Sequence, residues 1–184
     1  MIPVVKKNFF DSKMLGLLKV QCDLLKNSNI EVDNNEFFRK FVHNHPLLRV
    51  LHGNMVEEAS EIFGEKVKPS YVFLSMYFKG QGAVPLHIDR PQCYRTIDVC
   101  LNQEKVWPIY VNHTDKWSED KEEQEKIKNN AGEYLLQPGD AVCYSGTDHP
   151  HFRRPMKELE EQKDNFCDLA FFHFVPENFE GSLH

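Results

Sequence analysis

The chain has 184 residues, a length that fits one domain and suffices to bury a hydrophobic core without disulfides. Its net charge is −6 and no stretch is strongly basic, which disfavours a nucleic-acid partner, because such affinity rests largely on Lys and Arg. No apolar run is long enough for a membrane span, which needs roughly 18 or more residues.

The N-terminus and the cysteines bear on the cellular compartment. The first residues lack the positive start, apolar core and cleavage site of a secretion signal. The five cysteines are odd in number and include no C-x-x-C pair, which favours buried free thiols over a disulfide frame or a zinc knuckle. Disulfides are rare in the cytosol, so we expect a cytoplasmic protein.

The first third of the chain has the pattern of helices. Asp11 can cap a helix whose apolar residues recur at helical spacing as far as Leu25. Asp33 or Asn34 is expected to open a second helix. Its apolar side would carry Phe37, Phe38, Phe41 and Val42. A third helix is expected from about Pro46 to Phe63, ended by Gly64.

From Pro69 onward the pattern changes to that of strands, rich in β-branched and aromatic residues. Tyr71–Phe78 is the first candidate strand, and residues 79–82 are turn material. Six further candidates are Val84–Ile88, Thr96–Leu101, Trp107–Val111, Glu133–Leu136, Ala141–Ser145 and Asp168–Val175.

The pattern predicts one domain over residues 1–184, with mainly helical support in 1–68, a strand-rich core in 69–176 and a tail in 177–184. The highly charged run within 113–130 is expected to be a solvated insertion between two strands, with a mobile lid as the alternative. Seven short strands after a helical block predict an α+β fold whose antiparallel strands form a sandwich or barrel.

The run His87-Ile88-Asp89 contains two side chains that can bind one metal ion. Residues i and i+2 of a strand share a face, so both can point into a barrel. Two histidines and one carboxylate on one face of an octahedron are the set expected of non-haem Fe(II) oxygenases. An H-x-D pair alone is weakly specific, so a further histidine must complete the site.

The third ligand is expected after the tight turn at residues 138–140 and the strand that follows it. Two histidines compete for the position. His149 precedes a proline, which biases it to an extended or turn conformation typical of a surface loop. We prefer His151, which begins the segment after that turn. His173 on the last expected strand is expected in the core or behind the metal ligands.

Five motifs occur in a specific order and spacing, although no single one is specific. They are Met76-Tyr77 before a Gly-rich turn, His87-x-Asp89, Pro138-Gly139-Asp140 before a strand, His151, and Phe171-Phe172-His173-Phe174. As a set, over residues 71–175, they resemble the 2-oxoglutarate/Fe(II)-dependent dioxygenases of the prolyl-hydroxylase type. The resemblance implies a double-stranded β-helix, a cupin-like jelly-roll barrel, with the N-terminal helices packed on one sheet.

The resemblance also implies cofactors and a reaction. Fe(II) would be held by His87, Asp89 and His151, with 2-oxoglutarate chelating the iron, O₂ as co-substrate and ascorbate as a further candidate. The implied reaction is hydroxylation of a C–H bond in an amino acid, a peptide or protein side chain or a small metabolite, with release of succinate and CO₂. Related halogenases carry Gly or Ala in place of Asp89, so its presence favours oxygen transfer.

The far carboxylate of 2-oxoglutarate needs a buried cation, because an unpaired buried charge is costly. The family usually supplies one at the start of the last strand, where this sequence offers only Lys163. Arg153 is the better candidate, because two residues beyond His151 it would share the inward face and its fork can grip a carboxylate. Tyr77 resembles the family's tyrosine that adds a hydroxyl to this carboxylate. The alternative is that Arg153 and Arg154 lie at the surface.

Three further residues are candidates for substrate contact. If Thr96 faces inward, so do Asp98 and Cys100, and a buried Asp98 would pair with an amine or guanidinium of the substrate. The opposite strand phase would place Asp98 at the surface. Arg90 directly follows Asp89, so it is expected to orient that carboxylate, to contact the substrate or to lie at the rim.

Two rival functions remain at this stage. One is a cupin-type metalloenzyme that does not use 2-oxoglutarate, although cupins more often carry three histidines and a glutamate, a pattern absent from this sequence. The other is a non-catalytic barrel that binds a partner or small ligand, against which the His/Asp/His set argues. The compact size favours a small-molecule substrate, and the oligomeric state is left open.

Overall fold

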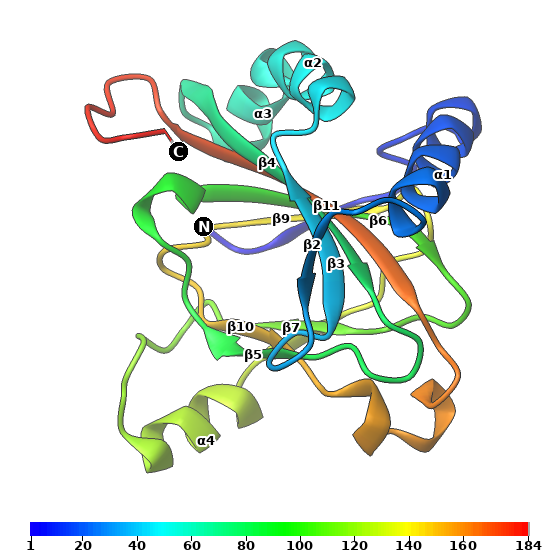
Figure 1. Ribbon diagram of the computed structural model, residues 1–184. Coiled ribbons are helices and arrows are strands. Elements are labelled where there is room, and N and C mark those ends of the chain that lie inside the picture. The colour runs from blue at the N-terminus through cyan, green and yellow to red at the C-terminus, as the bar shows by residue number, and fades with distance from the viewer. Residues whose placement is uncertain (184) are drawn as a thin grey trace.

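The computed structural model describes residues 1–183, which form two antiparallel sheets (Figure 1). The larger sheet consists, in spatial order, of β1 (Val4–Lys6), β9 (Ala141–Tyr144), β6 (Arg95–Gln103), β11 (Cys167–Pro176), β4 (Val67–Tyr77), β3 (Arg39–His43) and β2 (Glu31–Asp33). The smaller sheet consists of β5 (Val84–His87), β10 (His151–Arg153), β7 (Ile109–Val111) and β8 (Gly132–Tyr134).

One face of the larger sheet is covered by three helices (Figure 1). These are α1 (Ser12–Lys26), α2 (Pro46–Asn54) and α3 (Val56–Phe63). Under them lie alternate residues of the central strands, such as Leu74, Ile97 and Phe172, each at most 2% exposed. Full burial of such a side chain stabilises the fold by about 1.5–3 kcal/mol. The helical layer is therefore held by the principal hydrophobic core.

The opposite face of the larger sheet turns toward the smaller sheet. Because side chains alternate along a strand, Tyr77, Cys100 and Leu169 belong to a second core that also includes Val111 of the smaller sheet. This alternation confirms the inward phase of Thr96, Asp98 and Cys100 and leaves the inner face of the larger sheet for a site.

The first and third predicted helices are confirmed. Asp11 caps α1, since its Oδ1 accepts a hydrogen bond of 2.8 Å from the Met14 N–H. The predicted 46–63 helix is two helices, α2 and α3, that meet at Met55. Gly64 ends α3 with φ of 68°, a left-handed conformation that favours glycine.

The second predicted helix is wrong, because this segment forms the hairpin β2–β3. Asp33 accepts hydrogen bonds from the N–H groups of Asn35 and Glu36, a turn that a sequence pattern does not distinguish from a helix cap. Phe38 then has φ of 54°, which ends any helical path. Pairing of β3 with β4 outweighs local propensity, so residues 1–68 contain three strands as well as helices.

All seven predicted strands are present, with ends within four residues of those expected, whereas β1, β2, β3 and β10 were not predicted. The charged run joins β7 and β8 as expected, but it also forms helix α4 (Lys121–Asn129). Asp120 caps this helix, and Ile127, 1% exposed, anchors it. All five cysteines are buried free thiols. Within residues 1–183, no helix combines the length and apolar character needed to cross a lipid bilayer.

The Asp140 carboxylate ties β1 to the turn before β9. It accepts hydrogen bonds from Lys7 Nζ at 2.8 Å, the Asn8 N–H at 3.0 Å and the Gln137 N–H at 2.9 Å. Burial raises the pKa of this carboxyl group, but the contacts with Lys7 and the two N–H groups outweigh burial, so the net shift is downward from 3.8.

We predict that Asp140→Asn lowers the free energy of unfolding at pH 7 by about 1–3 kcal/mol, because it weakens a buried acceptor with three donors. Because the pKa of Asp140 is lower in the folded than in the unfolded state, its ionised carboxylate stabilises the fold at pH values above 3.8. This contribution is lost as the pH falls through the folded-state pKa. Urea unfolding should therefore show a mutant deficit that shrinks below pH 3.8. Asp164→Asn, whose carboxylate is 82% exposed, is the control; an equal effect of both variants would contradict the assignment.

Candidate metal centre

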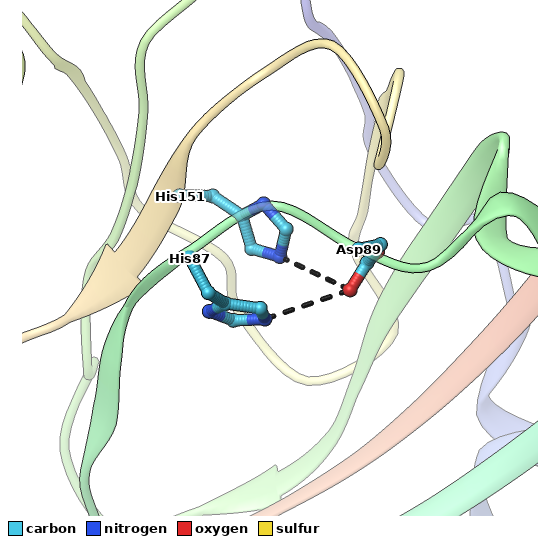
Figure 2. Close-up of side chains that lie close together, drawn as sticks. All are labelled: His87, Asp89 and His151. Atoms are coloured by element: carbon cyan, nitrogen blue, oxygen red, sulfur yellow. Dashed lines mark ion pairs between the residues drawn. The ribbon is translucent and has the colours of Figure 1, made fainter. Parts of the chain in front are cut away.

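Three side chains with ligand atoms converge where β5 meets β10 (Figure 2). His87, the last residue of β5, stands opposite His151, the first of β10, and their ring centroids are 4.3 Å apart. Asp89 turns back toward both rings, with its Oδ1 3.5 Å from His87 Nε2 and 3.8 Å from His151 Nε2. The structure thus brings together the three residues that the sequence singled out as ligands.

Backbone carbonyl groups orient both imidazole rings. Nδ1 of His87 lies 2.7 Å from the Pro85 carbonyl oxygen, and Nδ1 of His151 lies 2.9 Å from the His149 carbonyl oxygen. A carbonyl oxygen only accepts, so each Nδ1 is the protonated nitrogen. The two Nε2 lone pairs are consequently free to face Asp89 and a metal ion.

Two hydrogen bonds fix Asp89, one from its backbone N–H and one to its second carboxylate oxygen. Its N–H donates to the Gly146 carbonyl at 2.8 Å, and its Oδ2 accepts from Thr96 Oγ1 at 3.4 Å. A methyl group at Gly146 would overlap Asp89 Oδ2 and the Cys93 carbonyl oxygen. Only glycine therefore fits beside this carboxylate.

Burial and mutual contact set the charges of the three side chains. Burial lowers the pKa of His151 to about 4, so its imidazole is neutral at pH 7. Burial raises the pKa of Asp89, but the neighbouring histidines outweigh it and the net shift is downward. Burial lowers the pKa of His87, yet the contact with Asp89 outweighs burial and raises it. A carboxylate beside two imidazoles is the state that binds a cation.

The donor set fits Fe(II). Ligand atoms of His87, Asp89 and His151 lie within 4.8 Å of one another, and two imidazoles with one carboxylate leave coordination positions open. Asp89 forms a second close group with Cys93 and His173. That group is less suited to a metal, because burial raises the pKa of Cys93 to about 12 and keeps the thiol protonated.

The ligands open into a cavity of about 300 Å³, at the small end of ligand sites. Arg153 lines it and is 3% exposed, so the surface alternative for this residue is wrong. Its Nη2 donates to Asp98 Oδ2 at 2.9 Å, and its Nη1 donates to the Trp107 carbonyl oxygen. Lys163 has a side chain 55% exposed, pairs with Glu160 and does not line the cavity.

The three residues expected to contact the substrate, Asp98, Thr96 and Arg90, differ from one another in their surroundings. Asp98 is fully buried with Oδ2 on Arg153, while its Oδ1 has no partner among the described residues. Thr96 lies behind the ligands, where its hydroxyl is 3.1 Å from His173 Nδ1, instead of facing a substrate. Arg90 lines the cavity, and its Nε donates to the Tyr71 hydroxyl at 3.3 Å.

The competing histidine is not a surface residue. His149 is 5% exposed, and its Nδ1 accepts a hydrogen bond from the Ser145 N–H at 3.3 Å. Its backbone carbonyl oxygen orients the imidazole of His151. His173 lines the cavity and stacks on Phe171. Tyr77 also lines it, with its ring against Trp107.

Sequence reasoning missed the cavity wall contributed by β3. Phe37, Arg39, Phe41 and His43 all line the cavity, but the segment was expected to be a helix. No period-two alternation marks these residues, because the intervening Phe38 and Lys40 are also aromatic and basic.

We predict that Gly146→Ala weakens Fe(II) binding by about tenfold or more, because the added methyl group displaces Asp89. Anaerobic calorimetric titration with Fe(II) measures the effect. Gly53→Ala is the matched control, because nothing lies within 4 Å of a side chain added at Gly53. If Gly146→Ala binds Fe(II) as tightly as Gly53→Ala, the Asp89 carboxylate is not a ligand.

No family model matches the sequence, and no curated protein shows significant similarity to it. Solved structures resemble it in fold. HygX from Streptomyces hygroscopicus, crystallised with nickel and 2-oxoglutarate, superposes with a TM-score of 0.70 at 12% identity, covering 96% of this chain and 84% of that chain.

Two other structures extend the likeness. EctD from S. alaskensis with bound Fe gives a TM-score of 0.71 at 13% identity, over 98% of this chain and 75% of that one. A Pseudomonas putida prolyl-4-hydroxylase gives 0.66 at 11% identity, over 96% and 93%. The resemblance that the motifs indicated is confirmed at the level of the fold: this chain has the fold of the 2-oxoglutarate- and iron-dependent oxygenases.

Proposed function

We propose that the protein is a 2-oxoglutarate- and Fe(II)-dependent oxygenase that hydroxylates a small molecule. The observation that carries the proposal is a two-histidine, one-carboxylate group that opens into a cavity with a buried arginine. His87, Asp89 and His151 would hold the iron. When bound, Fe(II) and 2-oxoglutarate supply the activation of O₂ and the oxidation of a C–H bond, with succinate and CO₂ as co-products.

Arg153 is proposed to bind the far carboxylate of 2-oxoglutarate. Its guanidinium has five N–H donors, and the hydrogen bonds to Asp98 and the Trp107 carbonyl leave donors available. Its planar fork suits a carboxylate, and Tyr77 lines the same cavity with a hydroxyl to add. Asp98 and Trp107 would fix the guanidinium before the cofactor arrives, which lowers the entropic cost of binding.

The Asp98–Arg153 ion pair also favours a second candidate function. A carboxylate 2.9 Å from Nη2 already neutralises the Arg153 charge, so a second carboxylate gains less from it. A cupin-type metalloenzyme that binds its substrate directly at the metal, without 2-oxoglutarate, would need no free cation there. The two functions differ in one measurable property, which is 2-oxoglutarate binding.

The wider assignments follow from the same proposal. We propose that the two sheets are the halves of a double-stranded β-helix, a jelly roll, in a single domain that spans residues 1–184. A cavity of about 300 Å³ supports a small-molecule substrate, and HygX has been crystallised with hygromycin B bound. Five buried free thiols support a reducing, cytoplasmic environment.

Anaerobic titration of the Fe(II)-loaded protein with 2-oxoglutarate tests the function. We predict a saturable, weak charge-transfer band in the visible spectrum, because a keto acid chelating iron requires two open positions beside the three protein ligands. The His87→Ala and Asp89→Ala variants should lose both iron and the band while keeping the fold. Iron binding without a band would support the second candidate, and no iron binding would refute both.

We predict that Arg153→Gln weakens 2-oxoglutarate binding in this titration by about a hundredfold, because it removes a charge-assisted pair in a buried site. Lys163→Gln should leave the affinity unchanged, since the Lys163 side chain is exposed and paired with Glu160. Far-ultraviolet circular dichroism checks that Arg153→Gln remains folded. A larger effect from Lys163→Gln would identify Lys163 as the cofactor's cation.

A further inference from the structure

The part of the cavity wall formed by β3, β4 and the adjacent Arg90 carries cations but no free carboxylate. Arg39 on β3 and Arg90 beside the metal ligands both line it. Of the residues that the structure describes, the only carboxylates lining the cavity are Asp89, which faces the two histidines, and Asp98, which pairs with Arg153. In a chain of net charge −6, this wall therefore has the opposite sign from the molecule as a whole.

Arg39 has no ion-pair partner among the described residues. Its Nη1 donates to two neutral hydroxyl groups, Ser75 Oγ at 3.4 Å and Tyr77 Oη at 3.3 Å. Its Nε is buried with no hydrogen-bond partner. The facing acid across the hairpin, Asp33, accepts hydrogen bonds from the backbone N–H groups of the turn that follows it. An acceptor from a ligand would relieve this unsatisfied cation.

Aromatic rings surround the Arg39 guanidinium. Its central carbon lies 4.2 Å from the Phe37 ring centroid, 4.6 Å from that of Phe73 and 5.4 Å from that of Phe41. These cation–π contacts hold the fork in place without neutralising it. Phe171, which packs near Phe73, extends the apolar wall toward the metal ligands.

We infer that Arg39 and this aromatic wall bind the carboxylate of a small organic acid that has an apolar body, and that such an acid is the substrate. The guanidinium fork would pair with the carboxylate, while the rings of Phe41, Phe73 and Phe171 would cover the apolar body. The assignment of this acid as substrate rests on the proposed function. The binding of the acid does not, because the cation and the rings are present in the chain itself.

Arg39 and Arg153 would then have separate tasks in one cavity. Arg153 lies on β10 and is fixed by Asp98 and Trp107, whereas Arg39 lies on β3 in the opposite sheet. A keto acid held by the metal and Arg153 would leave Arg39 available for a second anion. The alternative, in which Arg39 binds 2-oxoglutarate itself, predicts a different outcome in the test below.

The test uses matched pairs of ligands on the full chain. Fluorine NMR measures the affinities of 4-fluorophenylacetate, 3-(4-fluorophenyl)propionate and 4-(4-fluorophenyl)butyrate, each against its carboxamide. We expect at least one carboxylate to bind about tenfold or more tightly than its amide, because only the carboxylate pairs with the guanidinium. If no carboxylate binds, or if acids and amides bind equally, the inference is wrong.

Variants identify the cation that causes this preference. Arg39→Gln should abolish the preference for the carboxylate, and Arg39→Lys should keep part of it, because the charge remains without the fork. Arg154→Gln is the matched control, since Arg154 is exposed and does not line the cavity. An undiminished preference in Arg39→Gln would overturn the inference. If Arg39→Gln does not fold, as judged by circular dichroism, the ligand pairs and Arg39→Lys still decide.

The titration with 2-oxoglutarate separates this inference from the proposed function. A charge-transfer band with no binding of the fluorinated acids refutes the inference and leaves the oxygenase intact. Arg39-dependent acid binding with no band supports an acid site and refutes the oxygenase. If Arg39→Gln instead weakens 2-oxoglutarate binding and leaves acid binding unchanged, Arg39 belongs to the cofactor site and the inference is wrong.

Discussion

The antiparallel pairing of β5 with β10 is the constraint on which the site depends. It sets His87 opposite His151, two residues 64 positions apart in the sequence that share no local structure. A slip of one residue in this register would turn one imidazole to the other face of the sheet. The Asp89–Gly146 backbone hydrogen bond joins the segments next to these strands and orients Asp89, the third candidate ligand. The convergence of the three candidate ligands is therefore a consequence of strand pairing, supported by a position that admits only glycine.

Because side chains alternate along the strands of the larger sheet, one face packs against the helices and the other face lines the cavity. On β4, Leu74 and Met76 pack beneath the helices, while Tyr71, Phe73 and Tyr77 face the cavity. Because the helical layer supplies the hydrophobic stabilisation, the inner face can accommodate buried charges that cost free energy. The Asp98–Arg153 pair lies on that inner side, as does Arg39, which has no ion-pair partner within residues 1–183.

The sequence was sufficient for features that depend on local periodicity or on a spaced motif. The strands around His87 and Asp98, the capped helix at Asp11 and the grouping of His87, Asp89 and His151 all followed from such patterns. The β2–β3 hairpin did not, because the turn at Asp33 satisfies the same hydrogen bonds as a helix cap, and only pairing with β4 decides between them. The Asp98–Arg153 partnership was equally inaccessible, since it joins residues 55 positions apart on different sheets.

The cavity contains two arginines in different electrostatic surroundings, and this difference affects how strongly each can bind an anion. Arg153 is buried, bonded to Asp98 and to a carbonyl oxygen, so its position is set before any ligand arrives. Arg39 is held by aromatic rings and two hydroxyl groups, none of which carries a negative charge. A ligand that meets Arg153 must share a cation with Asp98, whereas one that meets Arg39 finds a cation without an ion-pair partner among the described residues. Under the proposed function, an acidic substrate would therefore be drawn to the β3 wall, while the metal and Arg153 would hold the cofactor.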